Sequence, residues 1–572
     1  MAGDASRNVA QCIALALRRH GVSHVFAQSL PSAVILAAEA LGIRQIAYRQ
    51  ENMGGAMADG YARCSGRIGV VAAQNGPAAA LLVPPLAEAL KASIPVVALV
   101  QDVERGHTDR NAFQDLDQIA LFQSSTKWVR RLAAADRVDD YVDTAFAMAG
   151  SGRPGPVALL LPADLLRDIA PEPVFPRTAQ LGVWPLDRPR PPECLISEAA
   201  SILAQAHAPI ILAGGGIHAS QAADALAALQ QDCSIPVLTT NMGKGAVDEG
   251  HPLSAGVLGS LVGPGSLGQY TAALIGEADV VVLAGTRTNQ NGTDNWRQIT
   301  GDSKVIHIDI DPAEIGRTYE ALRLVGDVRE TLADLREALL RDTNLDRRTL
   351  ARPNIASRIA ACWDRFDKDR QASAHCAAAP IRPERVMHEL QALLTPQTII
   401  VADASYASMW VAGQLRALSA GMRFVTPRGL AGLGWGLPLA LGAKAARPDD
   451  AVVCIVGDGG FAHAWAEMET MIRSRLPVTI VVLNNGILGF QRDAETVKFG
   501  HYTSACHLGD VDHGLIAQAC GCPWVRIGDP LELREQLQRG LHGQEALLIE
   551  VMTDPQAHPP LSLFAAMDRS VR

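Results

Sequence analysis

The chain has 572 residues, of which 48% are hydrophobic and 19% charged, and this composition favours a compact protein with more than one hydrophobic core. A net charge of −9 without a run of lysine or arginine argues against a nucleic-acid partner. The ten cysteines include no CxxC pair, which argues against a zinc knuckle or a dithiol redox site and favours reduced thiols.

The N-terminal segment, residues 1–27, predicts an amphipathic helix that leads into a strand. It lacks an apolar stretch followed by a small-residue cleavage site, so we do not expect a signal peptide. The most apolar region, residues 78–100, is interrupted by Pro84, Pro85 and Pro95 and does not resemble a membrane span. We therefore expect a cytoplasmic protein without a membrane partner.

Short Val- and Ile-rich runs that end in Gly, Asn or Asp alternate with helical patterns along the whole chain. This alternation is typical of parallel sheets covered by helices on both faces. A proline-rich stretch at 171–192 and a polar stretch at 341–380 interrupt it and are interpreted as linkers. The sequence thus predicts an α/β fold of three doubly wound parallel-sheet domains, at residues 1–172, 190–342 and 380–560.

The third block contains a Gly-Asp-Gly-Gly turn at 457–460 between a buried strand and a helix. Its glycines allow a phosphate to approach the backbone, and Asp458 adds a hard oxygen ligand. The next strand ends on Asn484 and Asn485, the latter 27 residues after Asp458 (485 − 458). Turn residues close strands in many α/β proteins, but this pairing predicts a Mg²⁺–diphosphate site.

The order GDG, about thirty residues, then NN resembles the motif of thiamine diphosphate-dependent enzymes. The resemblance implies that Asp458, Asn485 and the backbone carbonyl of Ile487 bind Mg²⁺, which in turn holds the diphosphate of the cofactor. Neighbouring residues that it places against the cofactor are Gly457, Gly459, Gly460, Leu488, Gly489 and Phe490.

Two more segments of this block extend the resemblance. Residues 402–410, ADASYASMW, resemble the loop that holds the diphosphate from its other side, where the family often has Gly-Gln-His. Hydroxyls and backbone N–H groups must substitute here, and the residues concerned are Ala404, Ser405, Tyr406 and Ala407. Residues 429–443, GLAGLGWGLPLALGA, are very similar to the acetohydroxyacid synthase stretch GLGTMGFGLPAAIGA. That similarity places Gly432 against the cofactor and gives Leu433 the role of the apolar wedge that bends it, although an ordinary core leucine is the alternative.

The first block resembles the family region RHEQGAAHAADGYAR…GPG, and Glu51 falls on its catalytic glutamate. The resemblance implies that this carboxyl contacts the pyrimidine N1′ and promotes loss of the thiazolium C2 proton, while Gly76 contacts the cofactor. Interaction with a helix dipole is the structural alternative for Glu51. Gln50 and Leu81 depart from the histidine and asparagine that are common in the family.

Residues 110–128, RNAFQDLDQIALFQSSTKW, resemble the acetohydroxyacid synthase segment that contains DAFQE and ITK. The resemblance places Phe113, Gln114 and Lys127 near the cofactor and the substrate channel, and Gln114 and Lys127 are our candidate catalytic residues from this segment. Loop packing and a solvated lysine are the alternative. In this superfamily the two ends of the cofactor are held by different subunits, which implies a homodimer or homotetramer with the active site at the subunit interface.

The middle block resembles the central domain of acetohydroxyacid synthases, which binds FAD, whereas relatives bind ADP or nothing. Candidate contacts are Gly214 to Gly216, Arg287 and Asp309. The sequence leaves FAD, ADP and an empty site open.

Three substitutions depart from the synthase pattern. The loop at 28–32, QSLPS, replaces a glycine-containing YPGGA; Asn291 replaces an arginine that grips the acceptor carboxylate; and Ala494 replaces a tryptophan of the acceptor pocket. His463 is also unusual, and we predict either a proton-transfer residue or a structural histidine at a helix start.

The sequence therefore predicts a thiamine diphosphate- and Mg²⁺-dependent enzyme of the acetohydroxyacid synthase/pyruvate oxidase group that acts on small carbonyl substrates. Formation of acetolactate from pyruvate is the leading hypothesis. A lyase or carboligase that uses an aldehyde, a diketone or an acyl-CoA is the alternative, and a non-catalytic paralogous subunit is a third possibility.

Overall fold

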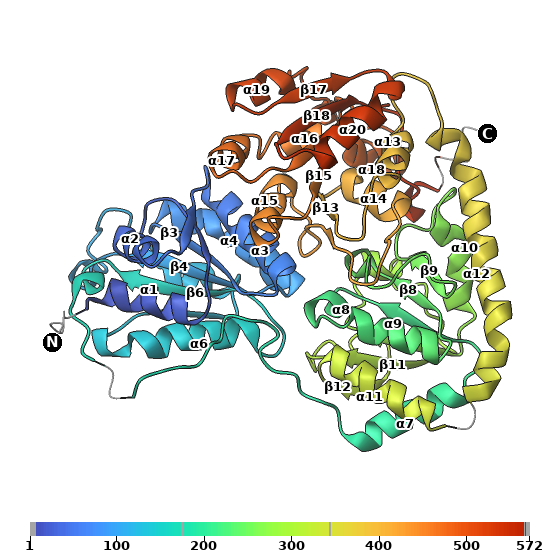
Figure 1. The fold of residues 1–572 in the computed structure, drawn as a ribbon, viewed down its shortest axis with the longest axis horizontal. Coiled ribbons are helices and arrows are strands. Elements are labelled where there is room, and N and C mark those ends of the chain that lie inside the picture. The colour runs from blue at the N-terminus through green and yellow to red at the C-terminus, as the bar shows by residue number, and fades with distance from the viewer. Residues whose placement is uncertain (1–6, 173–174, 343–344, 566, 568–572) are drawn as a thin grey trace.

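The computed structural model describes residues 7–172, 175–342, 345–565 and 567. Three six-stranded sheets in which all paired strands are parallel form three α/β units, one after another along the chain (Figure 1). The predicted fold class is therefore confirmed. Parts of both predicted linkers and the first six residues lie outside the described residues, and the exact domain boundaries stay a prediction.

The N-terminal sheet has the strand order β2-β1-β3-β4-β6-β5. Its strands are β1 (His24–Ala27), β2 (Arg44–Ile46), β3 (Gly69–Ala73), β4 (Val96–Asp102), β5 (Trp128–Arg131) and β6 (Val157–Pro162). Its helices are α1 (Val9–Arg19), α2 (Ser32–Ala40), α3 (Glu51–Ser65), α4 (Pro77–Ala92), α5 (Gln118–Gln123) and α6 (Val138–Gly150). The predicted first helix and strand are confirmed as α1 and β1.

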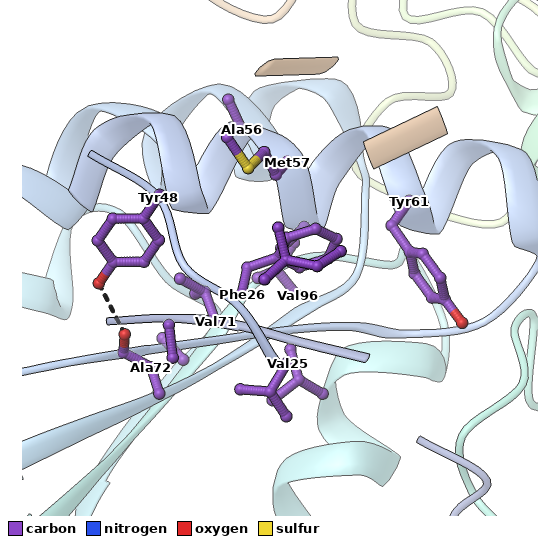
Figure 2. Packing of buried hydrophobic residues seen from close by; sticks show 14 of the residues in the cluster. Val25, Phe26, Tyr48, Ala56, Met57, Tyr61, Val71, Ala72 and Val96 are labelled. Carbon is purple, nitrogen blue, oxygen red and sulfur yellow. Dashed lines mark hydrogen bonds between the residues drawn. The ribbon is translucent and has the colours of Figure 1, made fainter. Parts of the chain in front are cut away.

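Helix α3 covers this sheet through small and apolar side chains. Figure 2 shows Met57 of α3 above Phe26 and Val71 of the strands, with all three side chains fully buried. The Tyr48 hydroxyl donates a hydrogen bond of 2.8 Å to the Ala72 carbonyl, which satisfies the one polar atom of that ring. The start of α3, where Glu51 lies, is therefore anchored to the sheet.

The middle sheet has the order β12-β11-β10-β7-β8-β9. Its strands are β7 (Pro209–Ala213), β8 (Val237–Thr239), β9 (Ser254–Val257), β10 (Val280–Ala284), β11 (Lys304–Asp309) and β12 (Leu322–Val325). Its helices are α7 (Glu193–Gln205), α8 (Gly216–Ala219), α9 (Ala223–Asp232), α10 (Leu267–Gly276) and α11 (Val328–Leu340).

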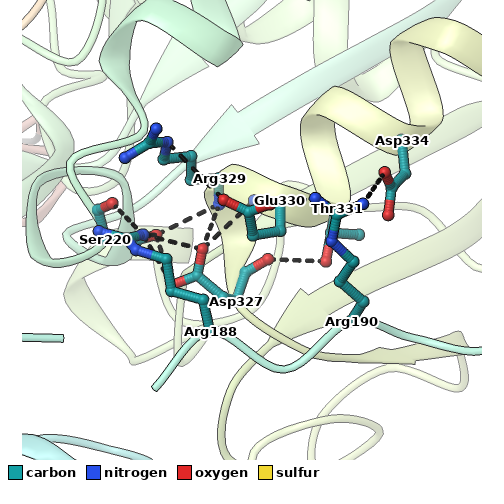
Figure 3. Close-up of polar contacts among 8 residues, drawn as sticks. All are labelled: Arg188, Arg190, Ser220, Asp327, Arg329, Glu330, Thr331 and Asp334. Atoms are coloured by element: carbon teal, nitrogen blue, oxygen red, sulfur yellow. Dashed lines mark hydrogen bonds and ion pairs between the residues drawn. The ribbon is translucent and has the colours of Figure 1, made fainter. Parts of the chain in front are cut away.

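The chain that enters this unit is fastened by ion pairs (Figure 3). Asp327 accepts hydrogen bonds from two backbone N–H groups at the start of α11 and also from the guanidinium of Arg188, at 3.1 Å. Arg190 pairs with Asp334 of the same helix at 2.9 Å. The end of the predicted proline-rich linker is thus attached to the middle unit.

The C-terminal sheet has the order β14-β13-β15-β16-β18-β17. Its strands are β13 (Ile399–Ala402), β14 (Phe424–Val425), β15 (Val452–Gly457), β16 (Thr479–Asn484), β17 (Trp524–Ile527) and β18 (Leu547–Met552). Its helices are α13 (Pro383–Gln391), α14 (Tyr406–Gln414), α15 (Gly436–Ala446), α16 (Asp458–Phe461), α17 (Glu467–Arg473), α18 (Gly489–Phe499), α19 (His513–Ala519) and α20 (Leu533–His542).

The polar stretch after residue 341 corrects the linker interpretation, because most of it forms the long helix α12 (Leu345–Ala374). Figure 1 shows α12 running beside both the middle and the C-terminal unit. Ile359 and Phe366 are buried, and the Trp363 indole donates to the Ser254 carbonyl at 3.0 Å. These three residues, spaced by four and three positions, anchor a helix that is otherwise rich in charged side chains, and the average polarity of the segment conceals them.

Helices α3 and α15 bring the first and third units together. A Cβ atom at Gly60 would lie 2.2 Å from the Leu439 carbonyl oxygen, and one at Gly442 would lie 1.9 Å from the Met57 carbonyl oxygen. Only glycine permits this approach, so the backbones pack directly against each other. Among the described residues, no helix combines the length and apolar character that crossing a membrane requires.

Candidate functional site

A cavity of about 690 Å³ opens at the carboxyl ends of β13, β15 and β16. Its volume lies within the roughly 300–1,000 Å³ range of cofactor sites, and its position is the one expected for ligands of open parallel sheets. Most predicted cofactor residues line it: Ala404, Ser405, Tyr406, Ala407, Leu433, Gly457, Asp458, Gly459, Gly460, Asn485, Ile487, Leu488, Gly489 and Phe490.

The candidate metal ligands meet at one edge of this cavity. Gly457 pairs with Leu483 in the parallel ladder, which places Asp458 and Asn485 just beyond two adjacent strand ends. Asp458 Oδ2 accepts a hydrogen bond from the Gly486 N–H at 3.0 Å, and burial raises the pKa of this carboxyl. Nearby positive charge would offset that cost of burial.

The donor set at this edge suits a hard cation. Among the described residues, no backbone N–H donates to the carbonyl of Ile487, so that oxygen is available. No group of three His, Cys, Asp or Glu side chains in the described part of the chain could hold a metal alone. The residues fit Mg²⁺, which takes few protein ligands and completes its shell with phosphate oxygens or water.

Gly460, in the turn after β15, makes room for the side chain of Asp403. A Cβ atom at Gly460 would lie 2.2 Å from Asp403 Oδ2. Asp403 itself accepts hydrogen bonds from the N–H groups of Gly434, Trp435 and Gly436 at 2.9, 3.0 and 3.1 Å. This buried carboxylate therefore joins the Gly-Asp-Gly-Gly turn to the loop that carries Leu433, and both of its oxygens accept hydrogen bonds.

Ser405 has an unusual backbone conformation at the opposite wall. It lies just before α14 with φ 66° and ψ −143°, a region that is nearly restricted to glycine. Its hydroxyl does not cap the helix, and the residue lines the cavity. The Ser405 hydroxyl is therefore not committed to the start of α14.

Comparison with known proteins agrees with this geometry. Residues 7–121 match the model of the thiamine pyrophosphate enzyme N-terminal TPP binding domain, residues 196–335 the central domain and residues 403–551 the C-terminal TPP binding domain. The chain is 33% identical to the probable acetolactate synthase large subunit of Methanocaldococcus jannaschii, over 96% of this chain and 93% of that protein.

The chain belongs to the thiamine pyrophosphate enzyme family. It is also 32% identical to an acetolactate synthase of Arthrospira platensis, over 94% of this chain and 92% of that protein. With an acetolactate synthase of Mycobacterium bovis the identity is 31%, over 90% of this chain and 83% of that protein. The resemblance noted from the motifs is thus confirmed over most of the chain.

The loop that carries Gly432 and Leu433 is held in place by a residue of the N-terminal unit. Glu88 of α4 accepts hydrogen bonds from the N–H groups of Gly429 and Leu430, both at 2.5 Å, and of Ala431 at 3.2 Å. Leu433 is 37% exposed. This exposure leaves its side chain available to contact a ligand, which a core leucine could not do. Sequence reasoning missed Glu88, since nothing in α4 alone indicates its partner.

Glu51 and His463 do not line the cavity within one chain. Glu51 is the first residue of α3, and the two N–H groups before it, those of Arg49 and Gln50, donate to Glu467 of α17 at 3.0 and 3.2 Å. His463 is exposed and lies against Gly434. A Cβ atom added to Gly434 would lie only 2.4 Å from the Cβ atom of His463. Their catalytic roles stay predictions.

Gly76, Gln114 and Lys127 belong to the N-terminal unit and also lie off the cavity. Gly76 and Gln114 are in contact, since a Cβ atom at Gly76 would lie 2.8 Å from the Gln114 Cβ, and the buried Gln114 Oε1 has no hydrogen-bond donor. Lys127 donates to the carbonyls of Met148 and Ser151 at 2.6 and 2.9 Å. Burial lowers its pKa to about 8. Their roles also stay predictions.

A second cavity, of about 150 Å³, lies where all three units meet. Among the predicted nucleotide contacts, Gly215, Gly216, Arg287 and Asp309 line it, while Gly214 packs behind them against Gly285. Burial raises the pKa of Asp309 to about 6.

The three departures from the synthase pattern fall in different places. Asn291 lines the larger cavity, together with Gln290 and Asn295 of the middle unit. Ala494 instead packs against the apolar core of the C-terminal unit. In the 28–32 loop, the Gln28 amide donates to the carbonyls of Tyr48 and Arg49, each at 3.3 Å, so this loop adjoins the start of α3.

Proposed function

We propose that this protein is a thiamine diphosphate-dependent acetolactate synthase, which decarboxylates pyruvate and transfers the two-carbon unit to an acceptor. The observation that carries the proposal is the cavity in which Asp458, Asn485 and the strained Ser405 converge, in a chain whose relatives are named acetolactate synthases. When bound, the cofactor supplies the carbanion chemistry that cleaves and forms the carbon–carbon bond.

The residues of this chain have separate tasks in the proposed reaction. Asp458, Asn485 and the Ile487 carbonyl would hold Mg²⁺, and the N–H groups that begin α14 and α16 would hold the diphosphate. Leu433 would give the cofactor apolar support, and Glu51 would share a proton with the pyrimidine ring. Ser405 stands at the position of the family glycine and would donate a hydrogen bond to the diphosphate, because Ala407 at the histidine position has no donor side chain.

A homo-oligomer, at least a dimer, completes the proposed site. Glu51 lies off the cavity of its own chain, so it can act only on a cofactor held by a second copy. Exposed apolar side chains support this arrangement, including Phe113 at 83% and Leu36 at 66% exposure. We propose that these surfaces are covered in the assembly, and a cytoplasmic location stays a prediction.

The second cavity is a candidate site for FAD or ADP. Arg287 and Arg423 line it, burial lowers the pKa of both, and neither forms an ion pair within the described part of the chain. Half-buried arginines without an acidic partner in the described part of the chain suit a diphosphate linkage. Absorbance at 450 nm of the purified protein, and mass spectrometry of the released nucleotide, distinguish a flavin from ADP.

A synthase that acts on a carbonyl without a carboxylate is the second candidate, because Asn291 on the cavity lacks the charge of the family arginine. The test is ¹³C NMR of the protein with thiamine diphosphate, Mg²⁺ and labelled pyruvate. Acetolactate is the expected product. Cofactor-loaded protein that leaves pyruvate unchanged but consumes an aldehyde or diketone would establish the second candidate instead.

A further inference from the structure

Arg428 is the only basic side chain among the described residues that line the larger cavity. It lies in the loop between β14 and α15, five residues before Leu433. One of its terminal nitrogens, Nη2, donates to the Ser408 hydroxyl and contacts the Met409 sulfur at 3.3 Å. Its Nε is buried and has no hydrogen-bond acceptor.

The charge of Arg428 is not neutralised within the described chain. It forms no ion pair there, and neutral groups are its only hydrogen-bond partners. The carboxylate whose charge it feels most, Glu88, already accepts three backbone hydrogen bonds from residues 429–431. Burial lowers the pKa of Arg428 to about 10, so the guanidinium still carries its charge at neutral pH.

The acids of the cavity do not supply a partner either. Both oxygens of Asp403 accept hydrogen bonds from backbone N–H groups, three bonds in total, and Asp458 lies at the candidate metal edge. A half-buried guanidinium whose Nε is buried without an acceptor is destabilised unless an anion completes its shell. The cavity is the side from which such an anion can approach.

We propose that Arg428 binds an oxyanion in this cavity and replaces, from the C-terminal unit, the cationic clamp that Asn291 lacks. This inference rests on the proposed function, which brings two oxyanions into the cavity: the carboxylate of the 2-oxo acid and the diphosphate of the cofactor. A guanidinium binds either through paired N–H groups. The variants below separate the two sources.

The variants are Arg428→Met, which keeps an unbranched side chain but removes the guanidinium, and Arg428→Lys, which keeps the charge but not the planar fork. Arg447→Met is the control, because Arg447 is half exposed at the end of α15 and pairs with Asp450 at 2.8 Å. For each full-length protein three affinities are measured by calorimetry: thiamine diphosphate with Mg²⁺, and then, on the loaded protein, the anion methyl acetylphosphonate and the neutral butane-2,3-dione.

If Arg428 binds the substrate carboxylate, Arg428→Met weakens methyl acetylphosphonate binding by about 10- to 100-fold and leaves the dione and cofactor affinities within about threefold. If it binds the diphosphate, the cofactor affinity falls by that factor instead. Arg428→Lys gives a smaller loss of the same affinity, and Arg447→Met changes none.

Unchanged affinities for all three ligands in Arg428→Met, with a lowered unfolding temperature, would overturn the proposal and make Arg428 a structural counter-charge of Glu88. If Arg428→Met does not fold, unchanged affinities in Arg428→Lys overturn it equally. Failure of the proposed function has a different signature, because the wild-type protein then binds the cofactor but not methyl acetylphosphonate. In that case the cofactor affinity of Arg428→Met, compared with that of the wild type, decides the role of Arg428.

Discussion

Substitution of Ser405 tests the link between backbone strain and cofactor binding. At φ 66° and ψ −143° a residue with a Cβ atom stores about 1–3 kcal/mol relative to glycine. Glycine loses about 0.5–1 kcal/mol through the greater freedom of the unfolded chain. We therefore expect Ser405→Gly to stabilise the apoprotein by about 1 kcal/mol, while Ser405→Ala keeps the strain and stays within about 0.5 kcal/mol of wild type.

The assay is urea unfolding followed by tryptophan fluorescence, since Trp410 and Trp435 are buried in the same unit. Cofactor affinity is measured in parallel, and both variants should lose the same hydrogen bond to the diphosphate, at a cost of about 1.5–3 kcal/mol. Equal stability of Ser405→Gly and Ser405→Ala would refute the strain argument. Wild-type cofactor affinity in Ser405→Ala would refute the role of the hydroxyl.

Three further variants probe other parts of the molecule. Glu51→Gln should leave cofactor affinity nearly unchanged and slow exchange of the thiazolium C2 proton by about 100-fold or more, measured by NMR; unslowed exchange removes Glu51 from that role. Glu88→Ala leaves three N–H groups without their acceptor and should cost about 3 kcal/mol of unfolding free energy, with weaker cofactor binding; unchanged stability contradicts the bracing of the loop. Burial alone would raise the pKa of Asp143, but hydrogen bonds from His20 and Arg19 lower it to about 2, from 3.8. Because the folded pKa is the lower one, this stabilisation is present above about pH 4 and is lost as pH falls toward 2. Asp143→Asn should therefore lower the free energy of unfolding by about 1–2 kcal/mol at pH 7, allowing for solvent screening, and by progressively less toward pH 3. Urea unfolding measures this difference, and a difference from wild type that does not change with pH would refute the role of Asp143.

Sequence reasoning was most successful where chemistry is local. The turn at 457–460 and the two asparagines each follow a strand directly, so the parallel ladder alone brings Asp458 and Asn485 to one edge. It was wrong at α12, where a few spaced apolar anchors suffice to hold a charged helix. It could not find Arg428, because an arginine before a glycine-rich loop looks like any solvated residue until its surroundings are known.

The sequence by itself determined the three α/β units, the family and the placement of Asp458 and Asn485 just after two adjacent strands, because hydrophobic period and motif spacing are properties of neighbouring residues. Tertiary structure alone decided that Glu88 braces the loop of Leu433, that Arg428 lines the cavity without an acidic partner among the described residues and that Glu51 lies away from this cavity. These outcomes depend on how closely units far apart in the chain approach, and that distance is set by packing, above all at Gly60 and Gly442, where the two helices touch backbone to backbone.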